Sequence, residues 1–192
     1  MAGKRDLRQA LLEAACEMFA AQGYGRTSTA AIVRRSRSSN GNLFHYFGNK
    51  DGLLRAAAAH ELAQRRAYID PVLAACAAGA ERLGVFAFLN AASGIAALGR
   101  LERYLTTVED RTWLEAVMAA QADYNAAVLG ANVSRERLGE PALAGHAFAG
   151  AILGALNAMI ATPALPRDGA ACRRIAEIAL RLAGLAPEEQ RV

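Results

Sequence analysis

Hydroxyl, amide, aromatic and basic side chains are concentrated between Thr27 and Leu53. Groups of these types can exchange hydrogen bonds with base edges, while basic side chains and free backbone N–H groups can hold phosphate oxygens. Gly41 lies in the middle of the polar run, where the lack of a side chain lets the backbone come close to a partner. The pattern predicts a surface that fits the major groove of double-stranded DNA.

Two short helices with a tight turn between them would position these side chains. The first begins at Thr27-Ser28-Thr29, whose hydroxyls can cap free N–H groups, and it buries residues 31–33. The second begins at Ser38-Ser39 and packs through Leu43 and Phe47, which lie four residues apart on one face. This is the layout of a helix-turn-helix.

The residues expected to contact DNA are the polar, aromatic and basic ones around this turn. They are Thr27, Ser28, Thr29, Arg37, Ser38, Ser39, Asn40, Gly41, Asn42, Phe44, His45, Tyr46 and Lys50. Lys50, at the start of the following helix, is expected to hold one phosphate, and Thr27 with Ser28 another. An amide such as that of Asn42 can make a paired contact with adenine.

The strings GYGRTSTAAIV and SNGNLFHYFGNKDGLL resemble the N-terminal DNA-binding domain of the TetR family of bacterial transcriptional regulators. The resemblance covers residues 5–65 and is specific in order and spacing. It implies an all-α protein, with a three-helix helix-turn-helix domain at 1–50 and a larger helical ligand-binding and dimerisation domain at 51–192. It also implies a ligand-responsive repressor that binds a palindromic operator as a homodimer and is released by a small-molecule inducer.

The turn departs from the family pattern. The family usually reads Ala-Gly-Val-Ser where this chain reads Ser36-Arg37-Ser38-Ser39, so the turn glycine is replaced. A left-handed Arg37 would cost about 1 kcal/mol. The string SRSSNGNL resembles a variant among multidrug-binding members, so we interpret it as a subtype. Phe44 stands where the family usually has a tyrosine that reaches a phosphate, and that contact should be absent.

Charge supports the same division of the chain. Residues 1–70 carry 11 Lys and Arg against 6 Asp and Glu, a balance of +5, whereas residues 71–192 carry 11 against 12, a balance of −1. A basic first part is the electrostatic footprint of a module that neutralises phosphates. The rest of the chain reads as helices punctuated by Gly and Pro, with a connecting helix at 51–68 that Pro71 follows.

The second part offers candidates for an effector pocket and a dimer interface, although each residue could also be plain core. Apolar and aromatic bodies with a few amides and hydroxyls are typical of small-molecule sites, and here they are Phe86, Leu89, Asn90, Tyr104, Trp113, Met118, Tyr124 and Asn125. Glu102, Glu109 or Asp110 would favour a cationic ligand if it faced inward. A stripe of small residues and a last amphipathic helix suit a symmetric four-helix interface, made by Gly150, Gly154, Ala158, Ile175, Ile178, Ala179 and Leu182.

Other function classes find little support. Residues 141–166 carry no charge and are long enough to cross a bilayer, but His146 and Asn157 interrupt them, so we expect a buried helix and no membrane partner. The N-terminus lacks the apolar core of a signal peptide, which predicts a cytoplasmic protein. We interpret Cys16, Cys76 and Cys172 as reduced core residues.

The sequence provides no catalytic residues, no metal-ligand spacing and no cofactor motif, so we expect neither an enzyme nor a cofactor. A helical protein-binding adaptor and a small all-α enzyme are the alternatives, and a salt titration with duplex DNA distinguishes them from a regulator. The effector, the operator and the choice between repression and activation stay open.

Overall fold

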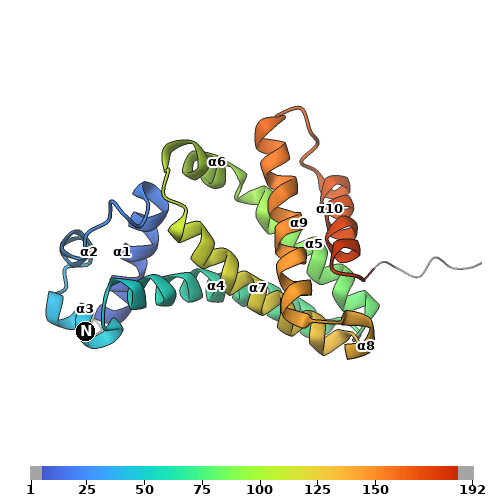
Figure 1. The fold of residues 1–192 in the computed structure, drawn as a ribbon, viewed down its shortest axis with the longest axis horizontal. Helices are drawn as coiled ribbons and strands as arrows, with labels where there is room; N and C mark the ends of the chain where they lie inside the picture. Colours follow the sequence, from blue (N-terminus) through green and yellow to red (C-terminus); the bar gives the residue numbers. More distant parts are fainter. Residues whose placement is uncertain (1–5, 186–192) are drawn as a thin grey trace, which may run out of the picture. The chain divides into compact units, whose positions relative to one another are not determined.

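The computed structural model describes residues 6–185, except the side chains at 106–107 and 135–136. The regular structure in this range is helical (Figure 1). The helices are α1 (Leu7–Gln22), α2 (Thr29–Ser36), α3 (Asn40–Phe47), α4 (Lys50–Ala75), α5 (Ala80–Ala96), α6 (Leu98–Thr107), α7 (Thr112–Asn132), α8 (Arg135–Leu138), α9 (Pro141–Ala161) and α10 (Gly169–Leu182). The all-α prediction is confirmed.

Contacts within the chain divide it into two compact units. Unit 1 joins Met1–Arg65 to Arg103–Ala120, and unit 2 joins Arg66–Glu102 to Gln121–Val192. Helices α4, α6 and α7 therefore each contribute residues to both units. The functional boundary that the sequence analysis placed at residue 50 stays a prediction.

In unit 1, helices α1, α2 and α3 pack against one another and bury a shared core. Phe19 of α1, Ile32 of α2 and Leu43 of α3 are fully buried in it. The ring of Phe19 also lies 5.7 Å from the ring of Trp113, measured between centroids. The segment Arg103–Ala120 is thus part of the core on which the first three helices are built.

In unit 2, α5 packs against α9 and α10, and α9 packs against α10 (Figure 1). The rings of Phe86 on α5 and Phe148 on α9 stack at 5.4 Å. Two glycines allow the closest approaches. A Cβ on Gly94 would lie 2.7 Å from Leu156, and a Cβ on Gly145 would lie 2.4 Å from the carbonyl oxygen of Ala122.

Helix α4 differs from the expected connecting helix, because it continues past Tyr68 and includes Pro71. A proline inside a helix removes one hydrogen bond and clashes with the carbonyl one turn earlier, at a cost of about 3 kcal/mol. Pro71 is exposed, and so is Ala67 one turn before it, so the freed carbonyl can be hydrated. Ile69 and Leu73, on either side of the proline, are buried and keep the helix in place.

Helix α9 is long and apolar enough to cross a membrane by length and composition, and α5 with α6 passes the same test only as a bent pair. The most apolar 18-residue window of α9 is 39% buried inside the structure. A single helix of this kind is weak evidence for a membrane span, because core helices of soluble proteins share these properties. The expectation of a helix buried on nearly all sides is met only in part within the single chain, where one face of α9 is exposed.

The cysteines are only partly as expected. Cys172 is buried, whereas Cys16 and Cys76 are half-buried. The Cys16 thiol donates to the carbonyl oxygen of Ala57 at 3.5 Å. Burial, followed by the charge of Glu61, raises the pKa of this thiol to about 12. Since the thiolate is the reactive form, the raised pKa makes the Cys16 thiol less reactive than an ordinary cysteine.

Candidate nucleic-acid interface

The helix-turn-helix is fixed by capping at three points. Ser28 begins α2 by accepting a hydrogen bond from the N–H of Ala31, and Ser39 begins α3 by accepting from the N–H of Asn42. Arg37 ends α2 in the left-handed conformation, at φ 53° and ψ 40°. With Arg37 in this conformation, the backbone N–H of the next residue, Ser38, donates to the carbonyl oxygen of Val33 at 3.0 Å and completes a Schellman turn. The turn thus keeps the geometry usual for glycine.

Helix α3 is anchored on one face and open on the others. Leu43 is fully buried and Phe47 is half-buried, as predicted. Phe44 and Tyr46 are 52% and 41% exposed, which is unusual for large aromatic side chains. The candidate DNA contacts that are exposed are Ser28, Arg37, Ser39, Asn40, Gly41, Phe44, His45 and Tyr46. Ser28 lies at the start of α2, and the others lie on the exposed sides of α3 and in the turn before it.

Other candidates have partners inside the protein. The Thr27 side chain is fully buried, and its hydroxyl donates to the carbonyl oxygen of Gly23 at 2.7 Å. The expected phosphate contact through this hydroxyl is therefore wrong, because Thr27 ties the turn between α1 and α2 to the end of α1. Thr29 and Ser38 are half-buried. Asn42 is also half-buried, and its side-chain N–H donates to the Ser38 hydroxyl at 3.2 Å.

Lys50 lies at the start of α4, where it is held by the turn between α1 and α2. Its ammonium donates to the carbonyl oxygen of Tyr24 at 2.7 Å and lies 3.9 Å from the centre of the Tyr24 ring. The Tyr24 hydroxyl in turn donates to the carboxylate of Asp51. Burial, followed by this bond to a carboxylate, raises the pKa of Tyr24 to about 12. Lys50 is thus fixed in place, with two further N–H groups that can donate to a phosphate.

The eight candidate pocket residues are divided between the two units. Tyr104, Trp113 and Met118 belong to unit 1. Trp113 packs on Phe19, and the Tyr104 hydroxyl donates to the carbonyl oxygen of Asp110 at 2.6 Å. Tyr104 and Trp113 are core residues of unit 1, which is the alternative that the sequence left open, and their place in an effector pocket stays a prediction. Aromatic residues of a core and of a pocket have the same helical spacing, so the sequence alone does not distinguish the two roles.

Unit 2 brings four of the other candidates together around a buried amide cluster. The Gln121 amide donates to the side-chain oxygen of Asn90 at 3.2 Å and to that of Asn125 at 2.8 Å. The Phe86 ring meets the Tyr124 ring edge to face at 5.6 Å. The Asn125 side chain is fully buried, and its N–H donors have no hydrogen-bond partner within the described structure. Leu89 is half-buried on the same helix as Asn90.

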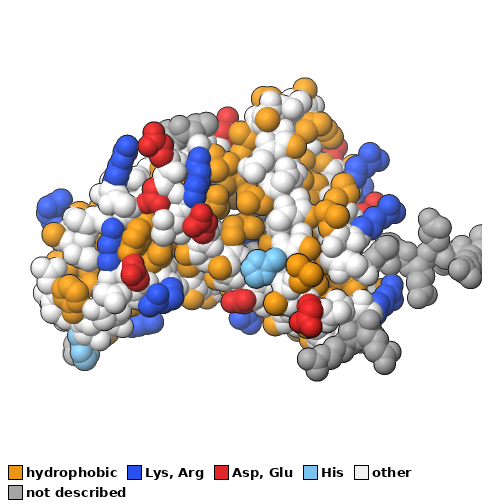
Figure 2. Space-filling view, viewed as in Figure 1, with side chains coloured by type: hydrophobic (Ala, Val, Ile, Leu, Met, Phe, Trp, Pro, Cys, Tyr) orange, Lys and Arg blue, Asp and Glu red, His pale blue; other side chains and the backbone are white. Residues whose placement is uncertain are grey.

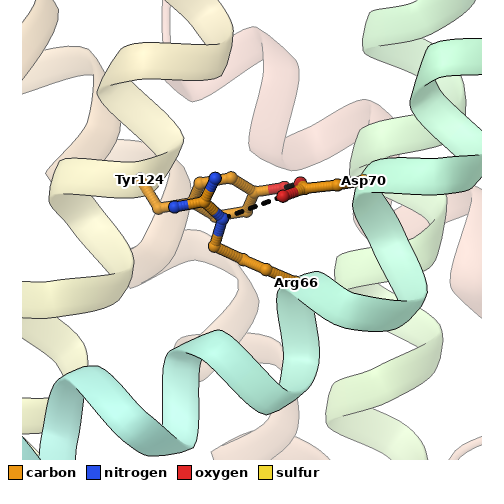
Figure 3. Close-up of polar contacts among 3 residues, drawn as sticks. All are labelled: Arg66, Asp70 and Tyr124. Carbon is orange, nitrogen blue, oxygen red and sulfur yellow. Dashed lines mark hydrogen bonds and ion pairs between the residues drawn. The ribbon is translucent and has the colours of Figure 1, made fainter.

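The ion pair of Arg66 and Asp70 beside this cluster was not predicted from the sequence. The Tyr124 hydroxyl donates to Asp70 at 2.5 Å, and the Arg66 guanidinium donates to the same carboxylate at 3.0 Å (Figure 3). Arg66 also lies 4.8 Å above the Tyr124 ring. Burial, followed by the bond to Asp70, raises the pKa of Tyr124. Arg66 and Asp70 are four residues apart on a helix, and this spacing could have predicted the ion pair.

The candidate dimer interface is mostly exposed in the single chain. Figure 2 shows mainly orange and white atoms over α9. The candidates on the open faces of α9 and α10 are Gly150, Gly154, Ala158, Ile178 and Leu182. Ile175 and Ala179 are buried within unit 2, because they lie on the face of α10 that packs inward. These two residues are therefore not available on the surface of one subunit.

Comparisons with known proteins agree with this geometry. Residues 11–57 match the family described as bacterial regulatory proteins, tetR family. Over 61 residues the chain is 39% identical to the transcriptional regulator BetI of Burkholderia thailandensis, and this stretch is 31% of either protein. The match thus spans about a third of the relative's length.

Solved structures resemble the whole chain. A protein of Shewanella sp. PV-4, described as a tetR-family transcription regulator, has a TM-score of 0.64 at 20% identity and covers 92% of this chain and 97% of its own. FadR of Bacillus subtilis, solved with stearoyl-CoA, has a TM-score of 0.58 at 16% identity, covering 89% and 96%. These likenesses show the fold alone. Residues 11–57 thus form a helix-turn-helix that matches the tetR family of bacterial regulatory proteins, and the chain shares its fold with a solved protein of that description.

Proposed function

We propose that this protein is a transcriptional repressor that binds a palindromic DNA operator as a homodimer and releases it when a small molecule binds. The observation that carries the proposal is the exposed surface of α3, which rests on the buried anchor Leu43 and presents Asn40, Gly41 and His45. Amide and imidazole groups at the start and middle of such a helix suit base edges in the major groove.

Phosphate contacts would position this helix on the duplex. The candidates with free donors are Lys50, the exposed Arg37 and the first turn of α2 after Ser28. Asn42, whose amide is partly used by Ser38, is a weaker candidate for base reading than Asn40. The excess of basic residues in the first part of the chain supports the same contact.

A second copy of the chain would cover the open faces of α9 and α10. Ile178 is 46% exposed and Leu182 is 62% exposed on α10, and Leu143 is 71% exposed on α9. Nothing lies within 4 Å of a Cβ placed on Gly150 or Gly154, so another helix can approach them closely. The α9 face carries no Asp, Glu, Lys or Arg, which suits a two-fold interface. Two recognition helices about 34–36 Å apart would then read successive major grooves.

The small-molecule effector would bind in unit 2, near the amide cluster of Asn90, Gln121 and Asn125. An unpaired buried amide donor is costly, and a ligand carbonyl or carboxylate would satisfy it. Helix α4 carries both Lys50, in unit 1, and Asp70, in unit 2. A ligand that favours one packing of α4 would shift the population of DNA-binding conformations. The protein would act in the cytoplasm, without catalysis.

The test begins with selection of a preferred duplex from a random pool by the full-length protein. We expect the selected sites to be palindromic, with affinity that falls steeply as salt rises. Lys50→Ala should weaken binding about eightfold per subunit at 0.1 M salt, because one fewer counterion is released from the DNA. The slope of log affinity against log salt concentration should become shallower by about one for each lost contact. Arg100→Ala removes an exposed charge in unit 2 and is the matched control.

Failure of the wild-type protein to bind any duplex at low salt would overturn the proposal and favour a protein-binding adaptor. Equal binding by wild type and Lys50→Ala would contradict only the assignment of a phosphate contact to Lys50.

A further inference from the structure

The loop between α6 and α7 is joined to the turn between α1 and α2 by one carboxylate. One oxygen of Asp110 accepts a hydrogen bond from the backbone N–H of Gly25, which lies 85 residues earlier in the chain. The other accepts from the N–H of Thr112 at 2.9 Å and caps the start of α7. Both ends of this contact belong to unit 1.

The loop that carries Asp110 is itself held rigidly. The Tyr104 hydroxyl donates to the Asp110 carbonyl oxygen at 2.6 Å. The Arg111 guanidinium donates to the carbonyl oxygens of Val108, at 2.5 Å, and Leu105, at 3.0 Å. These bonds hold the backbone beside Asp110, and the Thr112 N–H holds one of its carboxylate oxygens.

Two glycines make room for this loop. A Cβ on Gly23, which has a φ of +83°, would lie 2.7 Å from Val108 and 3.3 Å from the Cβ of Asp110. A Cβ on Gly25 would lie 3.2 Å from the Asp110 carboxylate oxygen. The close approach of the two segments therefore depends on the absence of side chains at both positions.

The contact reaches Lys50 through a single peptide group. The peptide that joins Tyr24 to Gly25 donates its N–H to Asp110 and accepts the Lys50 ammonium on its carbonyl oxygen. An anion at one end and a cation at the other polarise the same amide, so each hydrogen bond strengthens the other. Hydrogen bonds from Thr112 and Gly25, with a smaller contribution from the Lys50 charge, lower the pKa of Asp110.

We infer that Asp110 is a positioning residue for DNA binding: it fixes the Tyr24–Gly25 peptide, which in turn fixes the Lys50 ammonium for a phosphate. The inference rests on the proposed function, because it assigns Lys50 to the DNA backbone. It also makes the α6–α7 loop a point where movement of α6 or α7 changes DNA affinity. Asp110 lies outside the helix-turn-helix segment of the sequence.

Asp110→Asn tests the inference in the full-length protein. Asparagine has one side-chain oxygen, so it can accept from the N–H of Thr112 or of Gly25 but not from both. If it caps α7 as the aspartate does, the bond to Gly25 is lost. We expect weaker binding to selected and random duplexes alike, by up to about eightfold per subunit at 0.1 M salt. Glu109→Gln, an adjacent exposed carboxylate that loses the same charge, should bind like wild type.

A double variant separates positioning from general damage. If Asp110 acts through Lys50, Asp110→Asn should cause no further loss in the Lys50→Ala background. Asp110→Ser, which still caps α7 but is too short for Gly25, should behave like Asp110→Asn, and circular dichroism should show unchanged helicity.

The outcomes are distinct. Wild-type affinity in both Asp110 variants, or an equal loss with and without Lys50, would overturn the inference. Absence of DNA binding by the wild-type protein would instead overturn the proposed function.

Discussion

Replacement of Arg37 by glycine should stabilise the protein while weakening its binding to DNA. At φ 53° and ψ 40°, the Arg37 backbone is in a region that costs an L-residue about 1–2 kcal/mol and glycine almost nothing. The greater freedom of glycine in the unfolded chain returns about 0.5–1 kcal/mol of that gain. The side chain is exposed, so no packing is lost. We expect a net increase of about 0.5–1 kcal/mol in the free energy of unfolding.

Arg37→Ala is the matched control, because it removes the same charge but keeps the strained backbone. Denaturant unfolding at one protein concentration should give a higher midpoint for the glycine variant than for the alanine variant, with similar slopes. Both variants should lose DNA affinity equally, since both lack the guanidinium. Coincident midpoints for the two variants would refute the assignment of strain to Arg37.

Three further predictions test packing, acid stability and assembly. Gly145→Ala should destabilise the protein by several kcal/mol in denaturant unfolding, because its Cβ would lie 2.4 Å from a backbone oxygen. Gly84 is an exposed helix position with open space around it, so Gly84→Ala should stabilise the protein by up to about 1 kcal/mol. Hydrogen bonds from Thr112 and Gly25 hold the pKa of Asp110 below its ordinary value, so its stabilising contribution is present above the unfolded-state pKa and is lost as the pH falls through the folded value. Asp110→Asn should therefore flatten the acid unfolding curve. Gly154→Leu should give folded monomers with weak half-site binding in sedimentation and DNA titrations, and a fully dimeric variant would place the interface elsewhere.

Features set by neighbouring residues could be predicted from the sequence. Ser28 and Ser39 begin their helices because a short hydroxyl side chain competes well for free N–H groups, and Gly23 ends α1 because a positive φ suits glycine. Leu43 is buried as its spacing indicated. These choices depend on three or four consecutive residues, and therefore the order and type of the first helices could be read directly.

Features set by distant residues could not be predicted in this way. Asp110 was considered as a charge that could attract a cationic effector, yet its carboxylate binds Gly25. Trp113 has the residue type and spacing of a pocket residue, but in the structure its ring packs on Phe19. Pro71 normally ends a helix, but burial of the residues on either side of it keeps α4 intact. In each case the deciding contact joins segments whose separation in sequence carries no periodic signal.

The core contact between Phe19 and Trp113 bears on how this protein can be recombined with others. A chimera that takes only residues up to Arg65 would leave Phe19 without the indole that covers it and would expose apolar surface. The transplanted piece should therefore carry Arg103–Ala120 from the same parent, so that each donor supplies both halves of its own core. Exchange of operator specificity alone needs less, since residues of α3 can be replaced on the existing scaffold.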